Sequence, residues 1–456
     1  KWPFYSAVMA AISYVTGLSL THSAFVFNAV CYAWMTLAFI ALVRLMGGNK
    51  ATLWFAALVI LAFPTINKFR PTIIRDPAFY ALFLSACYAY FLYLKEGHAR
   101  YNIISILAFS FSALFRIEGF IYLFVTQAYI LGRHFFYKTN RVLGLVALFS
   151  LLLMMVVLIS WWQFTPNGEM SYLSLFTEPV RFLETVWLQV LEQMGQRLHA
   201  IETKVLVGYS QSYSVIVLLW SAMTIVFFEL LHALYYLYFI LWFIAWRKGL
   251  LFPEPKLYRP WRYLISVALL ILLGFVVIKW FLSERYPLTV SLLMLLAVPF
   301  LLASWRENIK LKKIKAGGYW LVLTLIVLSG VKSLDLATKK TYLKDAGYWM
   351  AQNLPAGASV YTNNRIIEHY YGHEAKVDFY WPFWEQHKTA VLLGRQHFEY
   401  AAINIKHGDK QHIANTALLI DRKVLAEYIN EKGNRLIIFD LKQSRQAVIP
   451  PPIHSR

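Results

Sequence analysis

Long apolar blocks are the feature of this chain that most limits what it can fold into. Between residues 21 and 334 such blocks recur, each roughly 20 residues long, which is enough for a helix to cross the hydrocarbon core of a bilayer. Hydrophobic residues make up 59% of the 456 positions and charged residues only 15%, far from the balance of a soluble protein. The sequence therefore predicts an α-helical polytopic membrane protein.

The spanning-length criterion predicts about ten crossings. They are Thr21–Leu45, Ala51–Thr65, Pro77–Leu94, Tyr101–Phe115, Gly119–Phe136, Val142–Trp162, Tyr213–Trp246, Tyr263–Trp280, Pro287–Trp305 and Gly318–Leu334. The run from Phe4 to Gly17 is too short to span comfortably, and we expect it to form a helix at the membrane interface. The block Tyr213–Trp246 is too long for one perpendicular crossing, so we expect one crossing with an interfacial extension.

Charge is distributed unevenly between the loops. The 44 basic and 24 acidic residues give a net charge of +20, and the basic residues gather in alternate loops, as the positive-inside rule describes. This pattern accounts for the charge without a nucleic-acid partner. The positive-inside rule places the basic loops in the cytoplasm. An even number of crossings then places both Lys1 and the C-terminal segment on the outer side. Cys31 and Cys87 fall within apolar blocks, so neither a disulfide framework nor a metal–thiolate site is expected.

Composition also predicts two domains, a membrane domain over residues 1–334 and a small α/β domain over residues 335–456 outside the bilayer. In the second domain, helices are expected at Tyr342–Leu354, Arg365–Tyr371 and Arg422–Glu431, and strands at Ser359–Tyr361, Tyr400–Ile405 and Arg435–Leu441, before an unstructured tail at Pro450–Pro452. The membrane domain includes an outer loop over residues 163–211. Within it, Pro179–His199 has helical periodicity and fits a helix on the membrane surface or one packed on the soluble domain.

Three short segments place charge at the ends of apolar blocks, on the side that we expect to face outward. They are Arg75-Asp76, Arg116-Ile117-Glu118 and Glu284-Arg285-Tyr286, with Lys279 about two turns before the last. Ionisable groups at membrane depth are costly unless they are paired or hydrated, so they usually mark a site. Arginine at an outer rim, where few basic residues are expected, indicates an anionic ligand such as phosphate.

Each segment also has a purely structural interpretation. Asp76 can cap a helix that begins at Pro77, Arg116 and Glu118 can pair to close a turn, and Arg285 with Tyr286 can anchor a helix end at the interface. The functional interpretation is that Arg116 points into a cavity, contacts phosphate oxygens and is oriented by Glu118.

In order and spacing, these residues resemble the GT-C membrane glycosyltransferases, in particular the glycosyltransferase family 39-like group of protein O-mannosyltransferases and lipid A aminoarabinose transferases. The resemblance runs from Trp2 to about Trp305. Trp2-Pro3-Phe4-Tyr5 is similar to the Pro-Pro-Leu-Tyr stretch of that family, and the three charged segments match its outer-rim positions. The C-terminal segment is similar to the periplasmic domains of many bacterial members.

The resemblance implies transfer of a sugar from a polyprenyl-phosphate donor to a lipid, glycan or protein acceptor, at the periplasmic side of the bacterial inner membrane. In this family a carboxylate acts as general base and cations stabilise the departing lipid phosphate. The usual catalytic Asp precedes the Pro-Pro-Leu-Tyr stretch, so the main base and a first span are expected upstream of Lys1. The catalytic candidates within this chain are Asp76 and Glu118, and the substrate-binding candidates are Arg75, Arg116, Lys279, Arg285 and Tyr286. No cofactor is expected, and no residue spacing indicates a metal.

Two other functions remain open at this point. A transporter or flippase of an anionic lipid-linked glycan would also need arginine at a rim and in a cavity, although such proteins commonly show internal repeats with matching broken helices, and none is visible here. An O-antigen ligase or polymerase is also membrane-bound and arginine-dependent, but resembles this order of segments less well.

Overall fold

The computed structural model describes residues 4–137, 192–250, 252–312, 315–334, 341–355, 357–372, 377–378, 398–405, 407, 422–431, 433–444 and 453–454. The chain divides into two compact units, Lys1–Leu334 and Asp335–Arg456. The predicted span Val142–Trp162 and the first part of the predicted helix Pro179–His199 lie outside the described residues. From residue 192 to residue 204 the chain is helical.

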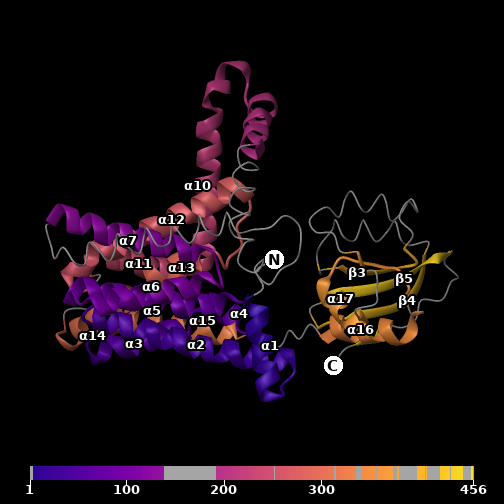
Figure 1. The fold of residues 1–456 in the computed structure, drawn as a ribbon, viewed down its shortest axis with the longest axis horizontal. Helices are drawn as coiled ribbons and strands as arrows, with labels where there is room; N and C mark the ends of the chain where they lie inside the picture. Colours follow the sequence, from indigo (N-terminus) through magenta and orange to yellow (C-terminus); the bar gives the residue numbers. More distant parts are fainter. Residues whose placement is uncertain are drawn as a thin grey trace. The chain divides into compact units, whose positions relative to one another are not determined.

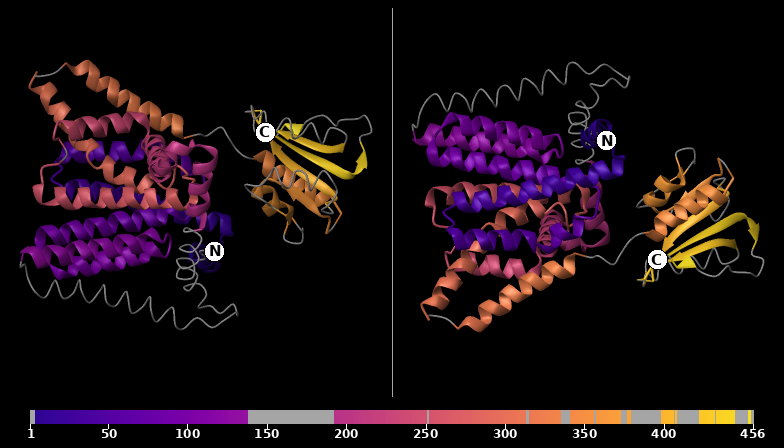
Figure 2. Two further views of the ribbon diagram at one scale, coloured as in Figure 1. Left: turned by 90° about the horizontal axis from the view of Figure 1, so that it is seen from above. Right: turned by 90° about the horizontal axis from the view of Figure 1, so that it is seen from below.

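The first unit is a helix bundle, shown in Figures 1 and 2. Its helices are α1 (Phe4–Thr16), α2 (Leu20–Leu45), α3 (Lys50–Leu61), α4 (Pro64–Phe69), α5 (Asp76–Glu96), α6 (Ala99–Ala113), α7 (Glu118–Tyr137), η1 (Gly208–Tyr213), α10 (Ser214–Leu234), α11 (Tyr236–Arg247), η2 (Pro255–Leu257), α12 (Tyr258–Lys279), α13 (Leu288–Leu295), α14 (Val298–Lys310) and α15 (Ala316–Ser333). Most run along a common direction, whereas α10 runs across it (Figures 1 and 2).

Six helical segments of the described residues are long and apolar enough to cross a membrane. They are Leu20–Leu45, Asp76–Glu96, Gly208–Leu234, Pro255–Lys279, Leu288–Lys310 and Ala316–Ser333. The protein therefore has the helices of a multi-pass membrane protein, but these segments account for only part of the roughly ten crossings that spanning length predicts. Phe4–Thr16, Lys50–Leu61 and Tyr236–Arg247 are apolar but shorter.

Three blocks that were expected to be continuous are interrupted. The expected span Ala51–Thr65 stops at Leu61 and restarts at Pro64, because a proline disfavours helical conformation in the residue before it. The expected span Pro287–Trp305 divides into α13 and α14 just before Pro299, which has no N–H to donate into the helix. The block Tyr213–Trp246 divides at Tyr235, whose φ of 61° lies in the left-handed region.

The core of the bundle is aromatic and closely packed around α5. Phe83 of α5 contacts the rings of Phe109 in α6 and Tyr122 in α7, with ring centroids 6.1 and 4.7 Å apart, and all three side chains are buried. Asn102 and Gln127 exchange two hydrogen bonds of 3.2 and 3.1 Å between α6 and α7, which satisfies a buried polar pair inside an apolar bundle. These contacts pack α5, α6 and α7 against one another, and the N-terminal ends of α5 and α7 carry the candidate site.

The second unit contains α16 (Thr341–Asn353), β1 (Val360–Thr362), α17 (Arg365–Tyr371), β2 (Val377–Asp378), β3 (Tyr400–Ile405), β4 (Arg422–Ile429), β5 (Arg435–Ser444) and β6 (Ile453–His454). The strand order is β2-β1-β3-β5-β4-β6, with β1 parallel to β2 and β3, and β5 antiparallel to β3 and β4. The two helices cover one face of the sheet (Figure 2). This is an α/β arrangement, and most of its predicted elements are confirmed.

The predicted helix Arg422–Glu431 is wrong, because this segment is strand β4. It pairs with β5 from Lys423↔Asp440 to Ile429↔Arg435, and β6 pairs with its other edge. Ala426 and Tyr428 are buried while their neighbours are only half-buried, which is the alternation of a strand. Strands β4 and β5 form an antiparallel hairpin joined by residues 430–434, and this pairing overrides the helical pattern of the single segment. The predicted tail at Pro450–Pro452 lies outside the described residues.

Candidate functional site

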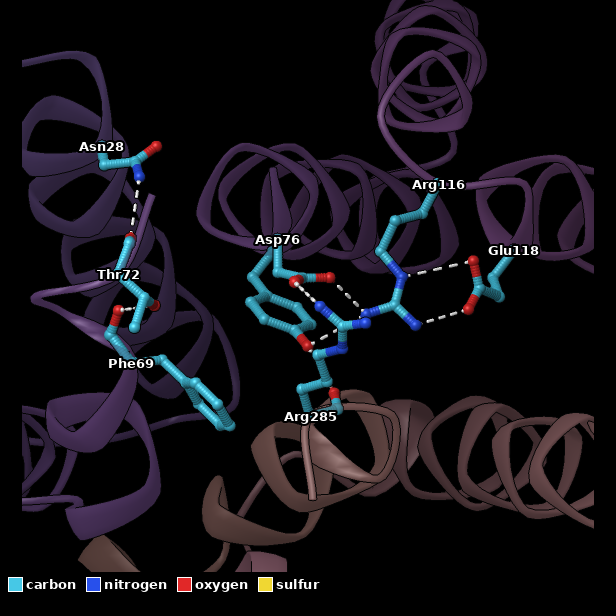
Figure 3. Close-up of polar contacts among 8 residues, drawn as sticks. Asn28, Phe69, Thr72, Asp76, Arg116, Glu118 and Arg285 are labelled. Carbon is cyan, nitrogen blue, oxygen red and sulfur yellow. Dashed lines mark hydrogen bonds and ion pairs between the residues drawn. The ribbon is translucent and has the colours of Figure 1, made fainter. Parts of the chain in front are cut away.

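The charged residues of three distant segments meet at one end of the helix bundle (Figure 3). Asp76 begins α5, Glu118 begins α7, and Arg116 lies in the turn between α6 and α7. Arg285 and Tyr286 come from the loop between α12 and α13. The expectation that these segments cluster is confirmed by direct contacts between them.

Arg116 is the centre of the cluster. Its Nη1 donates to Asp76 Oδ1 at 2.6 Å and to the Tyr80 hydroxyl at 3.3 Å. Its Nε and Nη2 donate to the two carboxylate oxygens of Glu118 at 3.3 and 2.5 Å. The Arg116 side chain is 4% exposed, and the rings of Phe79 and Tyr286 lie 5.2 and 5.0 Å from its guanidinium carbon. With most of its five N–H groups already used, Arg116 acts as an internal brace and has little capacity left for a phosphate.

The carboxylates around Arg116 keep its guanidinium group charged. Burial alone would lower the pKa of Arg116, but the nearby carboxylates of Glu118 and Asp76 raise the pKa well above its ordinary value. The pKa of the neighbouring Arg75 is instead lowered, first by burial and then by the positive charge of Arg116. The cluster contains three guanidinium groups against two carboxylates when Arg75 and Arg285 are included, so it keeps a net positive charge.

Asp76 does not cap α5, so the expected capping role of this residue is wrong. Helix α5 begins at Asp76 itself, with Arg75 in the capping position and no side-chain capping bond. The Asp76 side chain is instead 6% exposed, with Oδ1 on Arg116 and Oδ2 3.9 Å from Arg285 Nη1 (Figure 3). The Asp76 carboxylate thus joins arginines from two other segments of the chain.

Arg285 is the most accessible cation in contact with the cluster. Its side chain is 42% exposed, whereas its backbone carbonyl is fixed by a 2.7 Å hydrogen bond from the Tyr80 hydroxyl. Tyr286 packs on Phe275 with ring centroids 4.4 Å apart and lies beside both Arg116 and Arg285. Lys279 is exposed at the end of α12, and none of the contacts seen for the described residues joins it to this cluster.

Sequence reasoning missed Tyr80 and the links that hold the segment before Asp76. Tyr80 lies one turn after Asp76 on the same face of α5, and this spacing of four was the available signal. Asn28 of α2 donates to the Thr72 carbonyl at 3.4 Å (Figure 3) and accepts from the Tyr5 hydroxyl at 3.2 Å. On the other side, Lys68 pairs with Glu284 at 2.7 Å, which joins α4 to the loop that carries Arg285.

The turn that carries Arg116 depends on a close approach at Gly119. A Cβ atom at Gly119 would lie 2.4 Å from the backbone nitrogen of Ala113 and 2.5 Å from Ser112 Oγ. Neither group can move far, because Ser112 and Ala113 belong to the last turn of α6. The glycine therefore lets α7 begin directly against α6.

We predict that Gly119→Ala lowers the free energy of unfolding by about 1–3 kcal/mol, the usual cost of forced overpacking. The matched control is Gly132→Ala in the same helix, where an added Cβ would meet nothing within 4 Å. Alanine is the better helix former, so this control should be neutral or slightly stabilising. Thermal unfolding of the purified variants measures both, and equal behaviour of the two would contradict the packing argument.

Among the described residues, no group of three or more His, Cys, Asp or Glu side chains is arranged to hold a metal ion. Both cysteines, Cys31 and Cys87, are buried and free. What this arrangement offers chemically is a buried carboxylate beside an accessible guanidinium, at the end of an apolar bundle.

A scan against protein-family models and a search of curated proteins found no match to this chain. Family membership therefore stays a prediction, carried by the residues quoted above.

Proposed function

We propose that this protein is a membrane glycosyltransferase that moves a sugar from a polyprenyl-phosphate donor to a lipid, glycan or protein acceptor. The observation that carries the proposal is the convergence of Asp76, Arg116 and Arg285, from three distant segments, at one end of an apolar helix bundle. An apolar bundle suits a prenyl chain, exposed guanidinium groups suit a phosphate, and a carboxylate suits an acceptor hydroxyl.

The geometry favours a division of roles among these residues. Arg285, whose side chain is 42% exposed, holds the donor phosphate together with Arg75. Arg116 is less suited to this role, because Asp76 and Glu118 enclose it. Glu118 is a positioning residue, since both of its carboxylate oxygens bind Arg116. Asp76 is the carboxylate that we propose meets the acceptor hydroxyl, through Oδ2, because Oδ1 already accepts from Arg116.

In the proposed reaction, the acceptor oxygen attacks the anomeric carbon of the donor sugar. The bond between that carbon and the phosphate oxygen breaks, and its electron pair leaves with the polyprenyl phosphate. The acceptor proton passes to a carboxylate. The arginines stabilise the negative charge that develops on the departing phosphate. Electrostatic stabilisation of this kind is usually the largest single contribution to an enzyme's rate enhancement. We place the site on the periplasmic side of a bacterial inner membrane, opposite the basic loops.

The test is transfer by the purified full-length protein in detergent or liposomes, supplied with radiolabelled polyprenyl-phosphate sugars and a membrane extract as acceptor. The proposal expects release of polyprenyl phosphate together with labelled acceptor. Release that depends on neither Arg285 nor Asp76 would remove this cluster from the active site. Absence of transfer from every donor would contradict the enzyme itself.

A transporter or flippase of an anionic lipid-linked glycan is the second candidate. The observation that favours it is the set of discontinuous helices, with breaks between α3 and α4, α10 and α11, and α13 and α14. Broken helices near charged groups are common in transporters. Movement of the labelled lipid across vesicle membranes without sugar transfer would favour this candidate over the enzyme.

A further inference from the structure

The loop between α12 and α13, residues 280–287, carries Arg285 and is joined to neighbouring helices by two polar contacts. At the surface, Lys68 of α4 pairs with Glu284 at 2.7 Å, and these side chains are 58% and 37% exposed. In the interior, the Tyr80 hydroxyl of α5 donates to the Arg285 carbonyl at 2.7 Å. An exposed ion pair adds little to stability, whereas a buried hydrogen bond is costly to lose. Tyr80 is therefore the stronger of these two anchors.

The same hydroxyl group also contacts Arg116. It accepts a 3.3 Å hydrogen bond from Arg116 Nη1 while it donates to the Arg285 carbonyl. A guanidinium group can only donate, so the proton of the hydroxyl is left for the carbonyl. Tyr80 is 3% exposed, which keeps water from replacing either partner. The hydroxyl thus connects the brace at Arg116 to the backbone of the loop.

This connection fixes the main chain at Arg285 and leaves the side chain accessible. The Arg285 side chain is 42% exposed, with Nη1 3.9 Å from Asp76 Oδ2. Tyr80 lies one turn after Asp76, so a single helix places both the carboxylate and the hydroxyl that holds the loop of the guanidinium. Groups that act on a reacting centre need such support, because their position must be kept to within about 0.5 Å.

We propose that Tyr80 is a positioning residue of the transfer reaction, which holds the backbone of Arg285 so that its guanidinium group meets the departing phosphate beside Asp76. This inference rests on the proposed function and adds to it a residue that acts through Arg285. The proton of the Tyr80 hydroxyl is used within the protein, so Tyr80 does not act on the substrate itself. Its effect belongs to kcat more than to KM, because the position of the cation matters most when charge develops on the phosphate.

The experiment is Tyr80→Phe in the purified full-length protein, which removes one oxygen atom and keeps the ring. Initial rates of polyprenyl phosphate release should give a kcat lowered by about 10- to 100-fold, with KM changed by less than about threefold. The matched control is Tyr90→Phe in the same helix. Tyr90 is also buried, but its hydroxyl has no hydrogen-bond partner among the described residues, so this variant should keep the wild-type kcat.

A second comparison separates positioning from general damage to the fold. If Tyr80 acts through Arg285, Tyr80→Phe should lower kcat by less than about threefold in an Arg285→Gln background, where no guanidinium remains to be positioned. A loss as large as in the wild-type background would overturn the positioning role.

A third variant carries 4-aminophenylalanine in place of Tyr80, which restores a donor for the carbonyl and should recover most of the wild-type kcat. It also provides the test if Tyr80→Phe does not fold. A wild-type kcat in Tyr80→Phe, or no recovery with the restored donor, would overturn the positioning role while the proposed function stands. If the wild-type protein transfers no sugar, the proposed function fails and takes the role of Tyr80 with it.

Discussion

Arg116→Ala is expected to destabilise the protein by about 3–5 kcal/mol, because it leaves two buried carboxylates without their counterion. Asp76 and Glu118 both bind the Arg116 guanidinium, and their side chains are 6% and 18% exposed. Removal of one partner of a buried ion pair destabilises a protein far more than removal of both partners, because the remaining charge is buried without a counterion or water. Thermal or denaturant unfolding of the purified protein measures the effect.

Two controls make this prediction specific. Arg100 is exposed at the start of α6, and Arg100→Ala should change the free energy of unfolding by about 0.5 kcal/mol or less. The double variant Asp76→Asn with Arg116→Ala should lose less stability than the sum of its single variants, with a coupling of about 0.5–3 kcal/mol. Additive losses, or an equal loss in Arg100→Ala, would show that Arg116 is not the brace of this cluster.

Arg285→Gln is expected to behave in the opposite way, with a large loss of transfer and little loss of stability. The side chain is 42% exposed and its ion pair with Asp76 is 3.9 Å long, so its contribution to folding is at most about 1 kcal/mol. Removal of a preorganised positive charge from a leaving phosphate typically lowers kcat by about 100- to 1,000-fold. Initial rates of polyprenyl phosphate release, measured against unfolding of the same preparation, separate the two effects.

Arg247→Gln is the control for that variant, because Arg247 is exposed at the far end of α11 and should leave turnover unchanged. If Arg285→Gln instead unfolds the protein, or turns over at the wild-type rate, Arg285 is not the cation that holds the leaving phosphate.

The sequence was sufficient to predict that three segments share one end of the bundle, because alternation of apolar blocks determines which turns lie together. The pairing of Arg116 with Glu118 was also predictable, since both belong to one turn. The contact between Arg116 and Asp76 was not, because local capping rules assigned the Asp76 side chain to its own helix. Only the packing of α5 against α6 and α7 turns that side chain inward.

The misassigned elements have a similar cause. Strand β4 looks helical by itself, but it forms a hairpin with β5 across residues 430–434, and β6 pairs with its other edge. The prediction considered the segment alone and not its pairing with the strand that follows. The breaks at Pro64 and Pro299, in contrast, follow from proline chemistry that is present in the sequence.

The decisive measurement is a structure of the protein bound to a polyprenyl-phosphate sugar, because it shows whether the donor phosphate binds at the cluster of Asp76, Arg116 and Arg285. We expect the phosphate to lie within hydrogen-bonding distance of Arg285, with the prenyl chain along the apolar helices. Arg116 should keep its contacts to Asp76 and Glu118. A phosphate bound away from Arg285, or on the opposite end of the bundle, would contradict the proposed site.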